Sequence, residues 1–151
     1  MISEIETMVN EACARLCGWR WRVLAGGRTP CFEREPSVPL TSIVEDVPTP
    51  PDLNVLQEWQ WGAVPSYTTD RNALLEIFDG WGYETWFDYY REMIELTGAK
   101  HCVIDHARIP YFEQASPLIK CIASLKACKV WTCELDSMWL REQSGADLNA
   151  A

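Results

Sequence analysis

The 151-residue chain contains no long apolar run, since no stretch approaches the roughly 18 residues that a membrane-spanning helix needs. Its first residues, MISEIETMVNEACARLCGW, are acidic and carry a helical pattern. A secretory signal sequence has a basic start and an apolar centre instead. We therefore expect a soluble, intracellular protein.

Basic residues are also scarce: 13 Lys and Arg stand against 22 Asp and Glu, for a formal net charge of −9. General binding to nucleic acid or to an anionic membrane needs a broad basic surface. The composition therefore excludes both classes, and any anionic partner must be met by a local group of basic residues.

Motifs for phosphate loops, dinucleotide binding and zinc are lacking. The sequence LAGGRTP follows a predicted strand but has neither glycine pattern of a phosphate-binding loop. The seven cysteines include no C-x-x-C pair; the closest zinc candidates are Cys13/Cys17, Cys128/Cys133 and the group His101, Cys102 and His106. The odd count and the absence of a signal sequence favour reduced thiols, packed mostly as small apolar residues. We expect no metal and no cofactor.

The basic residues that are present gather near the N-terminus, around the stretch GWRWRVLAGG at 18–27. Residues 12–34 contain five arginines and a single acid, Glu33. Residues 19–24 alternate as a β-strand, which places Trp19 and Trp21 on one face and Arg20 and Arg22 on the other. The arginines must then find an aromatic partner elsewhere in the fold.

Helix and strand signals divide the chain into several elements. Ser3 and Glu6 form a predicted capping box for a helix that ends at Leu16. Further helices are predicted at 70–79 and from Ser116 and Pro117 onward. Residues 100–108 have a strand pattern, while 83–96 fit a helix and a strand equally well. We predict one domain over 1–142 and a flexible tail over 143–151.

Seven of the nine prolines lie between residues 25 and 65. This density excludes a long helix and allows at most short edge strands. The pieces SIVEDV and LNVLQEWQWGAV could pair onto the sheet. Long insertions of this type more often have a function than serve only as connections.

The motifs LCGWRW, PSYTTD and ASPLIKCIASLKA occur in an order that resembles the phage ABA sandwich domain family of small phage and prophage proteins. The similarity covers residues 2–24 and 65–128. It implies an α+β fold, a three-layer α-β-α sandwich around a small antiparallel sheet, with 83–91 and 100–108 as hairpin strands and with a long Pro-rich insertion added. It also implies a phage origin, and hence the cytoplasm of a bacterial host. The family brings no catalytic residues to transfer.

The best candidate group for a catalytic centre is His101, Cys102, Asp105 and His106. On a strand, His101 and Asp105 share one face while His106 lies on the other, so that Cys102 and His106 approach each other only if the strand bends. We therefore expect a non-enzymatic protein with structural histidines.

The arginine-rich window favours a binding function, because guanidinium groups match phosphate and aromatic rings stack on bases. We predict a homo-oligomer that sequesters a small nucleotide-like ligand, plausibly a host immune second messenger, as an anti-defence protein. The expected ligand-binding residues are Arg20, Arg22, Arg28, Trp59, Trp61 and Tyr67. The alternative is a protein-binding accessory factor whose acidic surface and exposed aromatics engage a host protein.

Overall fold

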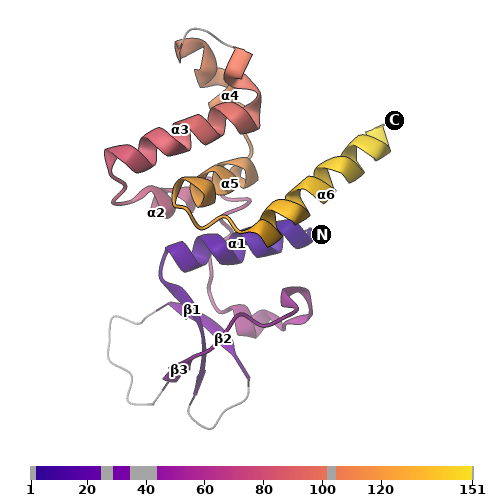
Figure 1. The fold of residues 1–151 in the computed structure, drawn as a ribbon. Helices are drawn as coiled ribbons and strands as arrows, with labels where there is room; N and C mark the ends of the chain where they lie inside the picture. The colour runs from indigo at the N-terminus through magenta and orange to yellow at the C-terminus, as the bar shows by residue number, and fades with distance from the viewer. Residues whose placement is uncertain (1–2, 25–28, 35–43, 102–104, 151) are drawn as a thin grey trace.

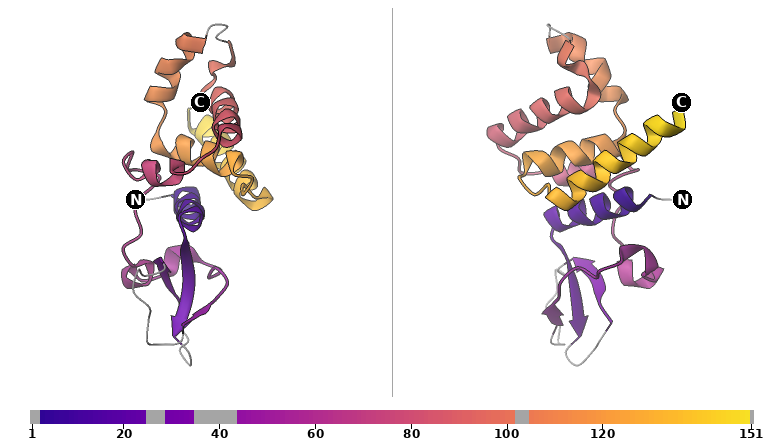
Figure 2. Two further views of the ribbon diagram at one scale, coloured as in Figure 1. Left: turned by 90° about the vertical axis from the view of Figure 1, so that its left-hand side faces the viewer. Right: turned by 45° about the vertical axis from the view of Figure 1, so that its right-hand side comes forward.

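The computed structural model describes residues 3–24, 29–34, 44–101 and 105–150. A small sheet lies at one end of the molecule, helix α1 lies next to it, and the remaining helices stack beyond α1 (Figures 1 and 2). The protein thus has the predicted α+β class: six α-helices and one three-stranded antiparallel sheet within the described residues.

Helix α1 (Glu4–Leu16) begins at the predicted capping box. The Ser3 backbone N–H donates to Glu6 Oε2 at 2.9 Å, and the Glu6 N–H donates to Ser3 Oγ at 3.3 Å. Cys17 caps the other end, and Gly18 then takes φ = 93°, a left-handed conformation that costs glycine little. This turn sends the chain directly into the sheet.

The sheet has the order β2-β1-β3, with β1 (Trp19–Leu24) in the middle. Strand β2 (Cys31–Arg34) pairs Phe32 with Trp21, and β3 (Val44–Asp46) pairs Asp46 with Arg22. The predicted strand 19–24 is confirmed, as is pairing by part of SIVEDV. Strand β2 was not predicted.

The second half of the Pro-rich insertion forms 3₁₀ turns, η1 (Leu53–Val55) and η2 (Glu58–Trp61), so the prediction that LNVLQEWQWGAV pairs as a strand is wrong. Gln60 is buried and donates from Nε2 to the Pro30 carbonyl at 3.2 Å. After η2, Gly62 has φ = 59°, and a Cβ there would lie 2.8 Å from the Phe32 carbonyl oxygen. Glycine thus lets η2 approach the backbone of β2.

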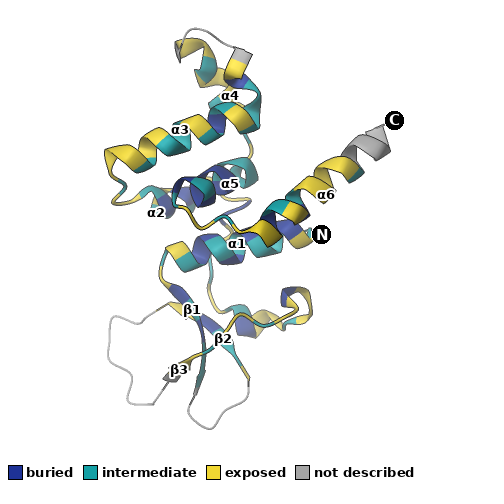
Figure 3. Ribbon diagram, viewed as in Figure 1, coloured by how far each residue is buried: buried dark blue, intermediate teal, exposed yellow. Residues whose placement is uncertain are grey.

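The helical part comprises α2 (Leu74–Phe78), α3 (Tyr83–Thr97), α4 (Ile109–Gln114), α5 (Pro117–Ala127) and α6 (Cys133–Ala150). Helix α5 lies between α1 and α3 and is the most buried of them (Figures 1 and 3). It begins as predicted: Ser116 caps it by accepting the Ile119 N–H, and Pro117 occupies the first turn. Only the second half of the predicted helix 70–79 forms, as α2.

The two hairpin strands that the family resemblance implies are wrong. Residues 83–91 belong to α3, and the described parts of 100–108 lie in the 3₁₀ turns η3 (Ala99–His101) and η4 (Asp105–Arg108). Tyr89, Met93 and Leu96 recur at helical spacing, and α3 packs along α5. The three-layer arrangement is not established, since the sheet that forms is built from other residues.

Helix α6 continues through residues 143–150, the segment predicted to be a tail. Within the described ranges, no helix combines the length and the apolar composition that crossing a bilayer requires.

Candidate functional site

The two faces of β1 are separated as its alternation predicts. Trp19 and Trp21 are buried, and Trp21 stacks on Phe32 with ring centroids 4.7 Å apart. Arg20 and Arg22 lie on the opposite face and are half-buried. The tryptophans therefore hold the strand in the core, and only the arginines are placed to meet a ligand.

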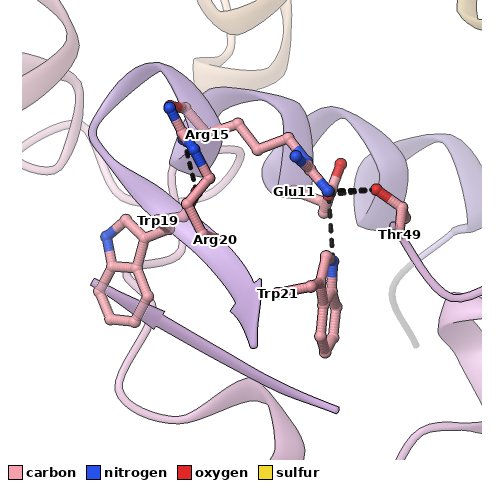
Figure 4. Close-up of polar contacts among 6 residues, drawn as sticks. All are labelled: Glu11, Arg15, Trp19, Arg20, Trp21 and Thr49. Atoms are coloured by element: carbon pink, nitrogen blue, oxygen red, sulfur yellow. Dashed lines mark hydrogen bonds and ion pairs between the residues drawn. The ribbon is translucent and has the colours of Figure 1, made fainter. Parts of the chain in front are cut away.

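Glu11 is a buried carboxylate on α1 at the centre of a polar cluster (Figure 4). Its Oε1 accepts from Arg15 Nε at 2.5 Å, from Trp21 Nε1 at 3.2 Å and from Thr49 Oγ1 at 3.2 Å. Arg15 also donates to Thr49. A buried charge is tolerated only when paired and hydrogen-bonded, and these contacts meet that requirement. They also fix the Arg15 guanidinium.

Arg20 closes the junction between α1 and β1 (Figure 4). One terminal nitrogen, Nη1, donates to the carbonyls of Arg15 and Trp19, each at 2.8 Å. A cation at a helix C-terminus is favoured by the helix dipole and by the unpaired carbonyls there. The other two nitrogens of Arg20 make no hydrogen bond to a described residue, so they can still donate.

Arg15 and Arg20 both line a cavity of about 590 Å³ between α1 and the start of α6. We call it the α1–α6 cavity. Its polar wall is completed by Glu11, Thr49, Thr132 and Glu134, and its apolar wall by Met8, Ala12, Leu16, Val130 and Leu135. Two anchored guanidinium groups beside an apolar wall suit a small anion that carries an apolar or aromatic part.

The structure does not bring the sequence-predicted site together. Arg20 lines the cavity, but Arg22 does not: its Nε lies 3.0 Å from Asp46 Oδ1 on β3. Arg28 lies outside the described residues.

The three predicted aromatic residues are dispersed, and none lines the α1–α6 cavity. Trp61 packs edge-on against Trp21, with centroids 5.3 Å apart, on the face of β1 opposite the arginines. Trp59 is exposed on η2. Tyr67 is fully buried, and its Oη has no hydrogen-bond partner among the described residues. Burial raises the pKa of Tyr67 well above its usual value.

Sequence reasoning missed Arg15, Thr49 and the α6 side of the cavity. Glu11 and Arg15 are four residues apart on a predicted helix, which is a recognisable ion-pair spacing. Thr49 and Val130 gave no local signal, because only the folded chain brings them to α1.

Most of the candidate catalytic group falls outside the description, whereas both candidate cysteine pairs are described. Of His101, Cys102, Asp105 and His106, only the side chain of His106 is described, and it is exposed. Six cysteines, including both Cys13/Cys17 and Cys128/Cys133, are free thiols. Burial raises the pKa of the Cys13 thiol, so this cysteine is unreactive at neutral pH. No group of three or more His, Cys, Asp or Glu in the described part of the chain could hold a metal.

Comparison of the chain with protein-family models, with curated proteins and with solved structures finds no match in any of the three.

Proposed function

We propose that this protein is a non-enzymatic binding protein that holds a small, nucleotide-like anion in the α1–α6 cavity. The observation that carries the proposal is the pair Arg15 and Arg20, both anchored by hydrogen bonds and both lining one cavity with an apolar wall. Donors held in place before binding lose little side-chain entropy when the ligand arrives.

The charges of the cavity support an anionic ligand of low charge. Arg15 is neutralised in part by Glu11, and Glu134 lies at the α6 side. Arg20 has no acidic partner among the described residues, so it is the residue that we expect to bind a phosphate or carboxylate directly. A highly charged ligand such as a nucleic acid strand would meet too few basic groups here.

The volume of about 590 Å³ is in the usual range for sites that take small organic molecules. A base or other ring would lie against Met8, Leu16 and Val130, since the expected aromatic partners lie elsewhere. This contact is apolar and non-directional, so it gives affinity without strong selection for one base.

Sequestration of a host immune signal by a phage protein in the bacterial cytoplasm is the biological role that we propose for this binding. It rests on the resemblance of the LCGWRW, PSYTTD and ASPLIKCIASLKA motifs and on the locally basic window in an acidic chain. Such a protein needs tight binding and no turnover.

Calorimetric titration of the purified protein with cyclic mono-, di- and trinucleotides and with cyclic ADP-ribose derivatives tests the proposal. We expect at least one of them to bind with Kd below ~10 μM and to remain chemically intact. Val130→Trp fills the cavity while neither arginine is substituted, and it should abolish binding. Val55→Trp, on η1 and away from the cavity, is the matched control and should bind as the parent does. Absence of binding across the panel, or binding unaffected by Val130→Trp, would contradict the proposal.

A further inference from the structure

Helix α3 has a second apolar face, which the described elements cover only in part. Its inner face, with Tyr89, Met93 and Leu96, is half-buried or buried, and α3 packs along α5. The outer face carries Tyr83, Trp86 and Phe87, spaced as one helical stripe, with 83%, 42% and 50% of each residue exposed. We call these three residues the α3 aromatic patch. Figure 3 shows exposed positions gathered at the N-terminal end of α3.

The patch is built on a rigid base. Phe78, Trp81, Trp86 and Tyr89 form a cluster in which every ring contacts every other, with centroids between 5.0 Å (Trp81 to Trp86) and 5.9 Å (Trp86 to Tyr89). Tyr83 and Phe87 stack on each other at 6.4 Å. Rigid aromatic side chains lose little entropy on binding, which is why they dominate the energetic centres of protein interfaces.

Acidic residues surround the patch. The segment 79–92 contains Asp79, Glu84, Asp88 and Glu92 but only one basic residue, Arg91. Asp88 pairs with Lys129 at 3.2 Å, which leaves Glu84 and Asp79 exposed and without an ion pair among the described residues. Two copies docked symmetrically through this face would bring like charges together. A basic partner would be attracted instead.

We propose that the α3 aromatic patch docks a basic, amphipathic segment of a partner protein. Apolar side chains of that segment pack on Phe87 and Trp86, and its Lys or Arg side chains reach Glu84 and the open ring faces. The inference is independent of the ligand-binding proposal, because the α1–α6 cavity uses none of these residues.

The test uses two synthetic peptides of about 18 residues, or five helical turns. Both peptides have leucine at the same positions. One carries Lys at all its polar positions, and the other carries Glu. Each is titrated into the isotope-labelled full chain and followed by amide NMR shifts and by calorimetry. The lysine peptide should bind, shift amides of 79–91, and bind at least tenfold more tightly than the glutamate peptide.

Three variants locate the interaction on the patch. Phe87→Ser should weaken lysine-peptide binding about tenfold or more, because it removes a central apolar contact. Glu84→Gln should weaken it less and make it less dependent on salt. Trp59→Ser removes another exposed aromatic, on η2, and should change nothing. Dispersed amide spectra of all three variants establish that they fold.

Three results would overturn the proposal: no binding of the lysine peptide, equal binding of both peptides, or shifts that map away from α3. Self-association of the parent chain that Phe87→Ser abolishes would also overturn it, since the occupant would then be a second copy.

Discussion

Glu11 is the residue on which the geometry of the candidate site depends most. Its carboxylate receives three side-chain donors from α1, β1 and the segment after β3. Glu11 therefore links Trp21 in the core to Arg15 in the cavity wall. Tyr67 differs from Glu11 in that its buried hydroxyl has no hydrogen-bond partner among the described residues.

Glu11→Gln should lower the free energy of unfolding by about 1–3 kcal/mol, because a charged acceptor is lost while one of its donors, the Trp21 indole N–H, stays buried. Arg15 is a third exposed, so solvent screening limits the ionic part of this loss. Urea denaturation measures the change, with the exposed Glu33→Gln as the control that should stay within ~0.5 kcal/mol of the parent. Equal stability of Glu11→Gln and the parent would mean that the cluster does not hold the site.

Tyr67→Phe should leave stability at pH 8 within about 1 kcal/mol of the parent, since the hydroxyl makes no hydrogen bond to a described residue. The folded state raises the pKa of Tyr67 above its ordinary value of 10.0, so the folded chain keeps the proton longer than the unfolded one. This contribution is fully present below pH 10 and is lost progressively as the pH rises above it. Denaturation at pH 8 and pH 11 should show a smaller decline for Tyr67→Phe than for the parent; an equal decline would refute the assignment.

Helix α3 is the element that most separates the structure from the strand that the family resemblance implies. Apolar residues lie on both its inner and its outer stripe. Together they alternate with polar residues along part of the sequence, and this strand-like pattern occurs in addition to the helical one. Met93, on the inner face, is its fully buried residue.

Met93→Ala should cost about 2–5 kcal/mol of unfolding free energy, because it leaves a cavity against α5. Glu95→Ala, two residues along and exposed, should cost ~0.5 kcal/mol or less. On a strand, Met93 and Glu95 would share a face and respond alike. Similar losses in chemical denaturation of the two variants would therefore argue against the helix.

Elements with local signals were predictable from the sequence. The capping box of α1, the Ser-Pro start of α5 and the alternation of β1 are each encoded within a few residues. Strand β2 depends on tertiary pairing with β1, and the turns at 53–61 depend on contacts with α1 and β2, none of which a local pattern specifies. The candidate site was predicted only in part: Arg20 belongs to it, whereas Arg22 is held by Asp46 and the aromatic residues follow the packing of the core.

At the scale of the whole molecule, the surface has two candidate sites of opposite charge: one contains a pair of arginines, and the other is acidic like most of the chain. The α1–α6 cavity offers cationic donors to a small anion, while the α3 aromatic patch offers carboxylates and rings to a basic segment. The two lie on different elements, so each can be tested without the other.

The most direct measurement is the affinity of Arg20→Gln, compared with Arg22→Gln, for the tightest-binding nucleotide of the panel. The two arginines lie on the same face of β1, but only Arg20 lines the cavity. Calorimetry should show a 10- to 150-fold loss for Arg20→Gln, about 1.5–3 kcal/mol for one charge-assisted hydrogen bond. Arg22→Gln should bind as the parent does. Unchanged affinity of Arg20→Gln, or an equal loss in both variants, would contradict the account.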